Sequence, residues 1–190
     1  MLKKILLVLV VTFFAGQANA EHTELVLGMG LGYGISNQSV SSWEVSSRPA
    51  ASSDGLVGRV KAGFMPTPVD AMYGFVQISQ LNYDTQQSNI DAAKLTLTGV
   101  GYSHYLNSDI GSPFFSVAVA TGGYRSNGGN DALDYRGQAF MLETGYEVLK
   151  HLQLSSTIMF ARMSDHNFYY EDDMQDISTT SMTFNIEFKL

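Results

Sequence analysis

The chain has 190 residues, with 11 Lys and Arg against 18 Asp and Glu, and it contains no cysteine. An acidic chain of this kind argues against nucleic acid as a partner. The lack of cysteine excludes disulfides, a thiol nucleophile and thiolate metal ligands. The mean hydropathy is close to zero. After the first twenty residues, however, no apolar run approaches the roughly 18 residues that a membrane helix needs, so the apolar residues must be distributed by alternation.

The first twenty residues have the features of a secretory signal peptide. The positive pair Lys3 and Lys4 precedes an apolar run over residues 5–15, and an Ala-Asn-Ala cleavage signal ends at Ala20. We therefore expect cleavage after Ala20, which leaves a single domain over residues 21–190. This domain keeps 9 basic residues, since Lys3 and Lys4 are lost from the 11, against 18 acidic ones.

The segment over residues 25–35 alternates large apolar residues with small ones. In an extended strand, period two places these two sets on opposite faces. The expected outer face carries Leu25, Leu27, Met29, Leu31, Tyr33 and Ile35. The opposite face is mostly glycine, which suits a narrow and crowded interior better than it suits solvent.

Six more strands are expected before the last one, at about 55–65, 71–83, 92–106, 114–125, 136–149 and 152–164. The third has two apolar sets in opposite phases, Tyr73 with Phe75 and Val76 with Ile78, which a β-bulge would reconcile. In the fourth we expect Leu95 and Leu97 to face outward. The final strand, 177–190, has the clearest alternation, with apolar residues from Met182 to Leu190 and polar residues between them.

The connections between these strands alternate in length. Longer polar segments are expected at 36–54, 84–91, 126–135 and 165–176, and short ones at 66–70, 107–113 and 150–151. Longer extracellular loops and short periplasmic turns are typical of outer-membrane barrels. In lipid the sheet must also close, because an open edge would leave backbone groups without hydrogen-bond partners. The predicted fold class is therefore all-β, an eight-stranded antiparallel up-and-down transmembrane β-barrel.

Tyrosines gather near the predicted strand ends, where they would form interfacial girdles with each ring at the acyl boundary. The set comprises Tyr33, Tyr73, Tyr83, Tyr102, Tyr105, Tyr124, Tyr135 and Tyr146.

The chain resembles the small eight-stranded outer-membrane barrels of the OmpA/OmpX type, within the outer membrane protein β-barrel domain group. The likeness rests on residues 25–35, 99–102, 114–124 and 184–190. It implies insertion into a Gram-negative outer membrane by the barrel-assembly machinery. Family members commonly end in an aromatic residue, whereas this chain ends in Leu190 with Phe188 two positions before it.

Charged residues are expected in the lumen, where a charge must be paired or hydrated. We expect a structural network that closes the interior, because eight strands leave little free bore. A gated path for ions or small solutes is the alternative. The expected members are Arg59, Lys61, Lys94, Glu143, Glu147 and Glu187, with Lys189 near the periplasmic end.

Two loops are candidates for a recognition surface. The first, 36–54, is rich in serine and contains Trp43, and the fourth is acidic with an aromatic centre. The fourth loop does not have the spacing of a calcium-binding EF-hand loop, so we predict no metal site there. Its candidate contact residues are Phe168, Tyr169, Tyr170, Glu171, Asp172 and Asp173.

No catalytic motif is evident, and we predict a protein that is not an enzyme and holds no cofactor. Ser103 and His104 are adjacent, so period two points them to opposite faces. A nucleophile and its base must come within hydrogen-bond reach. A non-local pair such as His104 with Ser116 stays open, as in a lipid A-modifying enzyme.

The sequence therefore predicts a structural or surface-interaction barrel of the outer membrane, whose extracellular loops serve as the recognition surface. The alternative functions are a passive carrier of small hydrophobic compounds and the lipid A-modifying enzyme. Expected partners are outer-membrane lipid, lipopolysaccharide and a host or phage surface ligand. We expect a monomer with no nucleic-acid partner.

Overall fold

The computed structural model describes residues 24–42, 48–83, 92–108, 111–126, 134–165 and 175–190. Within these ranges, no helix is long and apolar enough to cross a membrane. The described residues form a closed barrel of eight antiparallel strands, which confirms the predicted fold class. The strands are β1 (Glu24–Ser42), β2 (Arg48–Thr67), β3 (Asp70–Tyr83), β4 (Ala92–Tyr105), β5 (Pro113–Ser126), β6 (Asp134–Leu149), β7 (Leu152–Asp165) and β8 (Gln175–Lys189).

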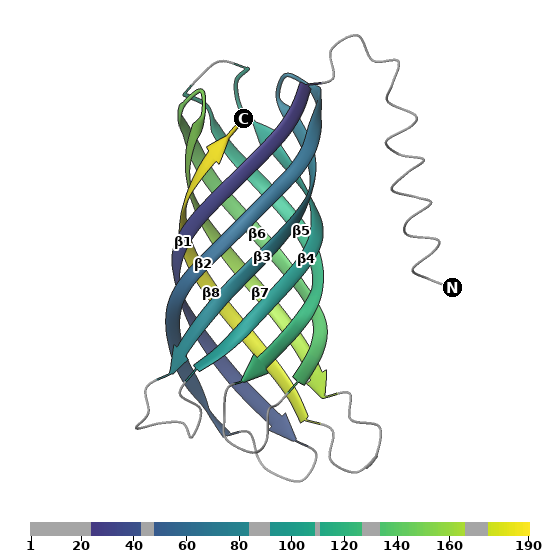
Figure 1. The fold of residues 1–190 in the computed structure, drawn as a ribbon, viewed down its shortest axis with the longest axis vertical. Coiled ribbons are helices and arrows are strands. Elements are labelled where there is room, and N and C mark those ends of the chain that lie inside the picture. The colour runs from purple at the N-terminus through teal and green to yellow at the C-terminus, as the bar shows by residue number, and fades with distance from the viewer. Residues whose placement is uncertain (1–23, 43–47, 84–91, 109–110, 127–133, 166–174) are drawn as a thin grey trace, which may run out of the picture.

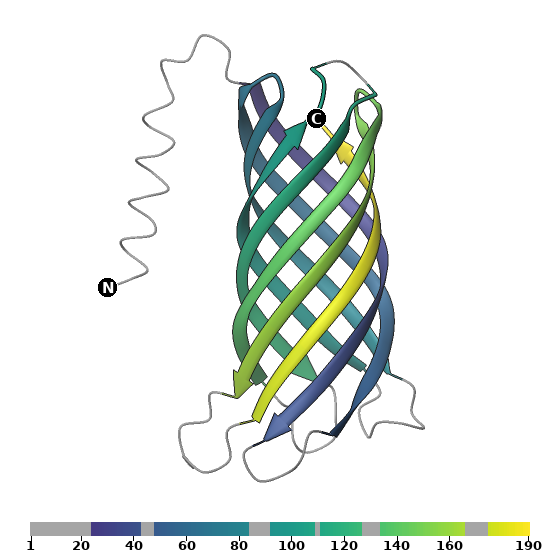
Figure 2. The same ribbon diagram turned by 180° about the vertical axis from the view of Figure 1, so that it is seen from behind.

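Each strand pairs with its neighbours in sequence, and β8 pairs back onto β1 (Figures 1 and 2). The connections β2–β3, β4–β5 and β6–β7 lie at one end of the barrel together with the C-terminus; we call this the turn end. The other four strand pairs are joined at the opposite end, the loop end (Figure 1).

The strands are strongly tilted, and the pairing register gives the shear of the barrel. Starting at Leu31 on β1, we step from each residue to its partner on the next strand until the path returns to β1. It returns at Ser41, ten residues closer to the loop end, so the shear is ten residues. Shear and strand number together set the diameter of a barrel. With eight strands, the interior is just wide enough for side chains to fill it.

The outer surface of the barrel is apolar over its middle. On β8, Phe184 and Phe188 are each 62% exposed, and on β1 Leu31 is 74% exposed. Water would disfavour such a continuous apolar surface, whereas acyl chains solvate it. The outward phase predicted for the large apolar residues of the first and last strands is confirmed.

No β-bulge occurs within β3. Its pairing with β4 is continuous from Asp70 to Asn82, Tyr73 and Phe75 are buried inside, and Val76 and Ile78 face outward. Both apolar sets fit because the lumen itself accepts large aromatic side chains.

The phase predicted for β4 is wrong. Lys94 is exposed on the outer surface, while Leu95 and Leu97 are the most buried residues of that strand, at 1% and 0% exposed. Lys94 is therefore not a member of the lumen network. Apolar residues occupy both faces of this strand, with Val100 outward, so polarity alone does not define its phase.

The first predicted loop is also mostly strand. Residues 36–54 were expected to be irregular, yet β1 continues to Ser42 and β2 begins at Arg48. Backbone pairing persists there, as in Asn37 with Ser52, although the side chains are polar. This hairpin extends past the apolar surface, so nothing requires its outward residues to be apolar.

The expected tyrosine girdle is mostly absent. Tyr33, Tyr102 and Tyr146 are exposed on the outside, whereas the other five tyrosines of the set point into the lumen and are buried. Closely packed aromatic rings fill a narrow barrel efficiently. The inward tyrosines are Tyr73, Tyr83, Tyr105, Tyr124 and Tyr135.

Candidate functional site

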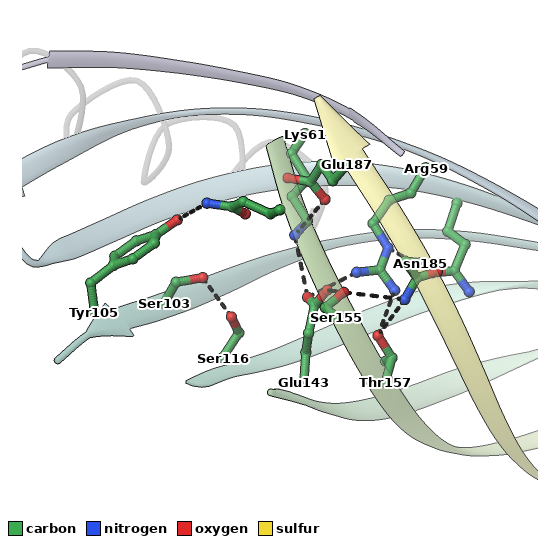
Figure 3. Close-up of polar contacts among 12 residues, drawn as sticks. Arg59, Lys61, Ser103, Tyr105, Ser116, Glu143, Ser155, Thr157, Asn185 and Glu187 are labelled. Atoms are coloured by element: carbon green, nitrogen blue, oxygen red, sulfur yellow. Dashed lines mark hydrogen bonds and ion pairs between the residues drawn. The ribbon is translucent and has the colours of Figure 1, made fainter. Parts of the chain in front are cut away.

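Four charged side chains from three strands meet inside the lumen (Figure 3). Arg59 and Lys61 come from β2, and both contact Glu143 of β6: Arg59 Nη1 lies 2.9 Å and Lys61 Nζ 3.2 Å from Glu143 Oε2. Lys61 Nζ also lies 2.8 Å from Glu187 Oε2 on β8. We call these four residues the lumen ion network. Their side chains are all at most 8% exposed.

Neutral groups complete the hydrogen bonds of this network. Ser155 donates its hydroxyl to Glu143 Oε1 at 2.6 Å. Arg59 donates Nε to Gln77 Oε1 at 2.9 Å and Nη2 to Thr157 Oγ1 at 3.3 Å. A buried charge is tolerated only when it is paired and its remaining hydrogen bonds are made. The network meets that condition and ties β2, β3, β6, β7 and β8 together across the lumen.

Small and aromatic neighbours shape the space around these charges. A Cβ atom on Gly28 would lie 2.7 Å from Glu187 Oε1, so the inward glycine face of β1 provides the room for this carboxylate. Lys61 Nζ lies 4.9 Å from the ring centroid of Tyr73, and Arg59 lies 6.0 Å from that of Phe75. These cation–π contacts replace water around the cations.

An apolar layer lies between the lumen ion network and the loop end. On β6, which runs away from the loop end, Tyr135, Ala139 and Met141 precede Glu143. The ring centroids of Tyr135 and Tyr124 are 6.1 Å apart, and Tyr124 hydrogen-bonds Tyr83 through the two hydroxyls. Other members are Leu81, Leu95, Leu97, Met159, Met163 and Ile177. The lumen is therefore more apolar than the sequence predicted.

The lumen widens at the turn end. There Lys189 Nζ lies 3.7 Å from Glu147 Oε1, and Gln153 donates to the hydroxyl of Tyr105. A cavity of about 260 Å³ opens beside Tyr105, Glu147 and Lys189. Two cavities deeper in the lumen, one of them beside Arg59 and Glu143, are about 10 Å³ each, enough for a single water. The side chains packed around these two cavities leave no room for a larger solute.

Five of the six expected residues lie in the lumen. Arg59, Lys61, Glu143 and Glu187 form one network, and Glu147 lies apart from it beside Lys189. Lys94 lies outside. The polar and aromatic partners of the network were not anticipated, since only the pairing register shows which residues face one another. Trp43 and the fourth-loop candidates Phe168, Tyr169, Tyr170, Glu171, Asp172 and Asp173 lie outside the described residues.

The serine and histidine residues of β4 and β5 do not form a catalytic pair. Ser103 and Ser116 hydrogen-bond each other at 2.6 Å inside the lumen. His104 faces outward, where its Nδ1 lies 2.9 Å from Asp70 Oδ1. His104 and Ser116 therefore lie on opposite faces of the wall. Among the described residues, no three His, Asp or Glu side chains gather as metal ligands.

Comparison with known proteins shows the fold. No protein-family model and no curated protein matches the chain. Among solved structures, Neisserial surface protein A is 12% identical with a TM-score of 0.55 and covers 90% of this chain and 100% of its own. The Yersinia pestis attachment invasion locus protein Ail, solved with the heparin analogue sucrose octasulfate, is 10% identical with a TM-score of 0.53 (88% and 99% covered). Pseudomonas aeruginosa OprG is 10% identical with a TM-score of 0.50 (89% and 97% covered).

The chain has the fold of the small eight-stranded outer-membrane β-barrels. Its apolar outer surface agrees with a location in the outer membrane. In bacterial barrels of this kind, short turns face the periplasm and loops face the exterior. By this rule we expect the turn end of the barrel to face the periplasm and the loop end to face the exterior.

Proposed function

We propose that this barrel is a structural and surface-interaction protein, with its extracellular loops as the recognition surface. The observation that carries the proposal is the packing of the lumen. The lumen ion network and the apolar layer occupy the interior, so we expect no path for solutes through it. The apolar outer wall contacts lipid. The loop end is then the surface that remains available to bind a partner.

The β1–β2 hairpin supports this proposal. β1 and β2 have 19 and 20 residues, whereas β3, β4 and β5 have 14 each. The extra length of the two strands extends past the apolar surface at the loop end (Figure 1). A rigid hairpin presents a contact segment at a lower entropic cost than a free loop does.

The proposal predicts that the protein does not conduct ions across a membrane. Purified barrel reconstituted in a planar bilayer should show no stable open level, because charge pairs and packed side chains replace water in the lumen. An open porin reconstituted in the same bilayer serves as the positive control. A reproducible open conductance level from the barrel would contradict this expectation and the function built on it.

The recognition surface is tested by shortening the loops one at a time. Residues 43–47 and 166–174 are each replaced by a two-residue turn, and residues 127–133 are shortened in the same way as the matched control. Cells that carry each variant are then compared for adhesion to matrix proteins, serum resistance and phage sensitivity. We expect the first and fourth loop variants to lose at least tenfold in one of these assays. Unchanged behaviour of every variant would refute loop recognition.

A passive carrier of small hydrophobic compounds is the second candidate. The apolar layer favours it, since Leu95, Leu97 and Met163 would suit an apolar solute. A solute would however have to displace side chains that leave only about 10 Å³ of space. Uptake of a fluorescent naphthylamine into proteoliposomes faster than into protein-free liposomes would favour this candidate over the first.

A further inference from the structure

Four outward-facing basic residues lie on four adjacent strands: Lys94 on β4, Arg125 on β5, Arg136 on β6 and Arg162 on β7. All four are exposed. We call them the basic belt. They are four of the 9 Lys and Arg that follow residue 20 in an otherwise acidic chain. Basic residues are therefore concentrated on this part of the wall, where Asp176 of β8 pairs with one of them, Arg162.

The register places the members of the belt beside one another. Lys94 and Arg125 are direct partners across β4 and β5. The partner of Arg125 on β6 is Asp134, and Arg136 follows two positions later on the same face. The partner of Arg136 on β7 is Ser164, and Arg162 lies two positions before it, again on the same face.

These offsets keep the belt at one level. Direct partners climb toward the loop end by ten residues over the eight strands, or just over one residue per strand. Arg136 lies two residues to the periplasmic side of Asp134, and Arg162 lies two residues to the periplasmic side of Ser164. These two offsets are opposite in direction to the shift of the register toward the loop end, and they compensate for it. The four positions agree in height to within about two residues, or about 6 Å of strand.

The belt lies where lipid phosphates are expected. Moving toward the periplasm, the next outward residue on β7 is Phe160, and on β6 Phe140 follows Gln138; both phenylalanines are exposed to lipid. The polar headgroups begin at the edge of such an apolar band. The charges of the belt are thus on the extracellular side, at the headgroup level of the outer leaflet.

The described outward residues of the other half of the barrel lack such charges. Within two residues of the same level, they are Ser178 and Thr180 on β8, Asn37 on β1, Ser52 and Asp54 on β2, and Gln80 and Asn82 on β3. None of these is basic, and Asp54 is an acid that accepts the hydroxyl of Tyr33. If these basic residues served only to anchor the barrel at the membrane interface, we would expect them around the whole barrel. Their restriction to four adjacent strands therefore indicates a ligand on that side.

We propose that the basic belt is a binding site for the phosphate groups of a phosphorylated outer-leaflet lipid, as in the lipid A part of lipopolysaccharide. Arginine matches phosphate oxygens with a planar pair of donors. Arg162 is held in position by Asp176, which accepts from its Nε at 3.2 Å and its Nη2 at 2.6 Å, and its side chain is still 75% exposed. The site depends on the outer-membrane location and not on loop recognition.

The test is native mass spectrometry of the folded barrel in mild detergent with purified bis-phosphorylated lipid A. Each basic side chain near an anionic lipid surface contributes about fivefold in affinity. The Lys94→Gln/Arg136→Gln variant should therefore retain about 25-fold less lipid A, and the variant with all four belt residues changed to Gln still less. Lys150→Gln, an exposed charge at the opposite end of the barrel, is the matched control and should retain lipid A as the unaltered protein does.

Two further arms identify the source of the phosphate. Enzymatically dephosphorylated lipid A should bind no better to the unaltered barrel than to the belt variants. Millimolar inorganic phosphate should not displace lipid A; if it does so fully, the site binds free phosphate and the lipid assignment is wrong. Equal lipid A retention by the unaltered barrel and the folded double variant would overturn the proposal. Because the loops are intact in all of these proteins, this result is separate from the loop-shortening experiment.

Discussion

Replacing Glu143 with Gln should lower the free energy of unfolding of the barrel by about 3–5 kcal/mol. Glu143 is the carboxylate that Arg59 and Lys61 share, and its side chain is 4% exposed. The amide keeps the shape but removes the charge, so Arg59 is left as a buried cation with only neutral partners. Lys61 retains Glu187. Denaturant unfolding in detergent micelles or vesicles, followed by circular dichroism and by the mobility difference of folded and unfolded barrel on gels, measures the change.

Glu147→Gln is the matched control for this prediction. Its partner Lys189 lies 3.7 Å away, and both residues line the cavity at the turn end. Water in that cavity can compensate for the lost charge, so we expect a loss below about 1 kcal/mol. Changing Arg59 and Glu143 together to Met should restore most of the stability, because no uncompensated charge then remains and the Lys61–Glu187 pair is intact. Equal losses for Glu143→Gln and Glu147→Gln would show that the lumen ion network does not stabilise the barrel.

The second large effect is expected at Gly137 on β6. A Cβ atom there would lie 1.9 Å from the carbonyl oxygen of Arg162 and 2.7 Å from Cα of Met163. Both are backbone atoms of β7, so no side-chain rotation relieves the contact and the two strands must separate. Overpacking of this kind costs about 1–3 kcal/mol. Gly137→Ala should therefore lower both stability and the yield of folded barrel.

Gly58 on β2 gives the opposite result. Its added Cβ would meet nothing closer than Leu31 Cδ2, at 4.0 Å. Glycine inside a strand costs about 0.5–1 kcal/mol relative to alanine, so Gly58→Ala should stabilise the barrel by about that amount. If the two alanine variants unfolded at the same denaturant concentration, the close approach of β6 and β7 would not be a constraint on folding.

The fold could be predicted from the sequence wherever the two faces of a strand differ in polarity. β8 is the clearest example, because Thr183, Asn185 and Glu187 face the lumen while the residues between them are apolar. On β4 this contrast is lost, since Leu95 and Leu97 pack inside and Val100 faces lipid. A lumen that is partly an apolar core reverses the rule that apolar residues face outward.

The site was predictable residue by residue but not as a set of contacts. The inward phase of Arg59 and Glu143 follows from alternation, whereas their pairing joins residues 84 positions apart. That contact depends on the register of every strand between them. The basic belt has the same origin: Lys94 and Arg162 are placed at one height only by the climb of the register around the barrel.

The seam between β1 and β8 has a consequence for assembly. The backbone of Leu190 both donates to and accepts from that of Leu27, so the first strand finds its last partner at the end of the chain. Until β8 arrives, β1 keeps an unpaired edge, which is a template for wrong pairing. Contacts so distant in sequence form slowly. The fraction of molecules that reach the native state therefore depends on how fast β8 pairs with β1, and on how well the edge of β1 is protected until then.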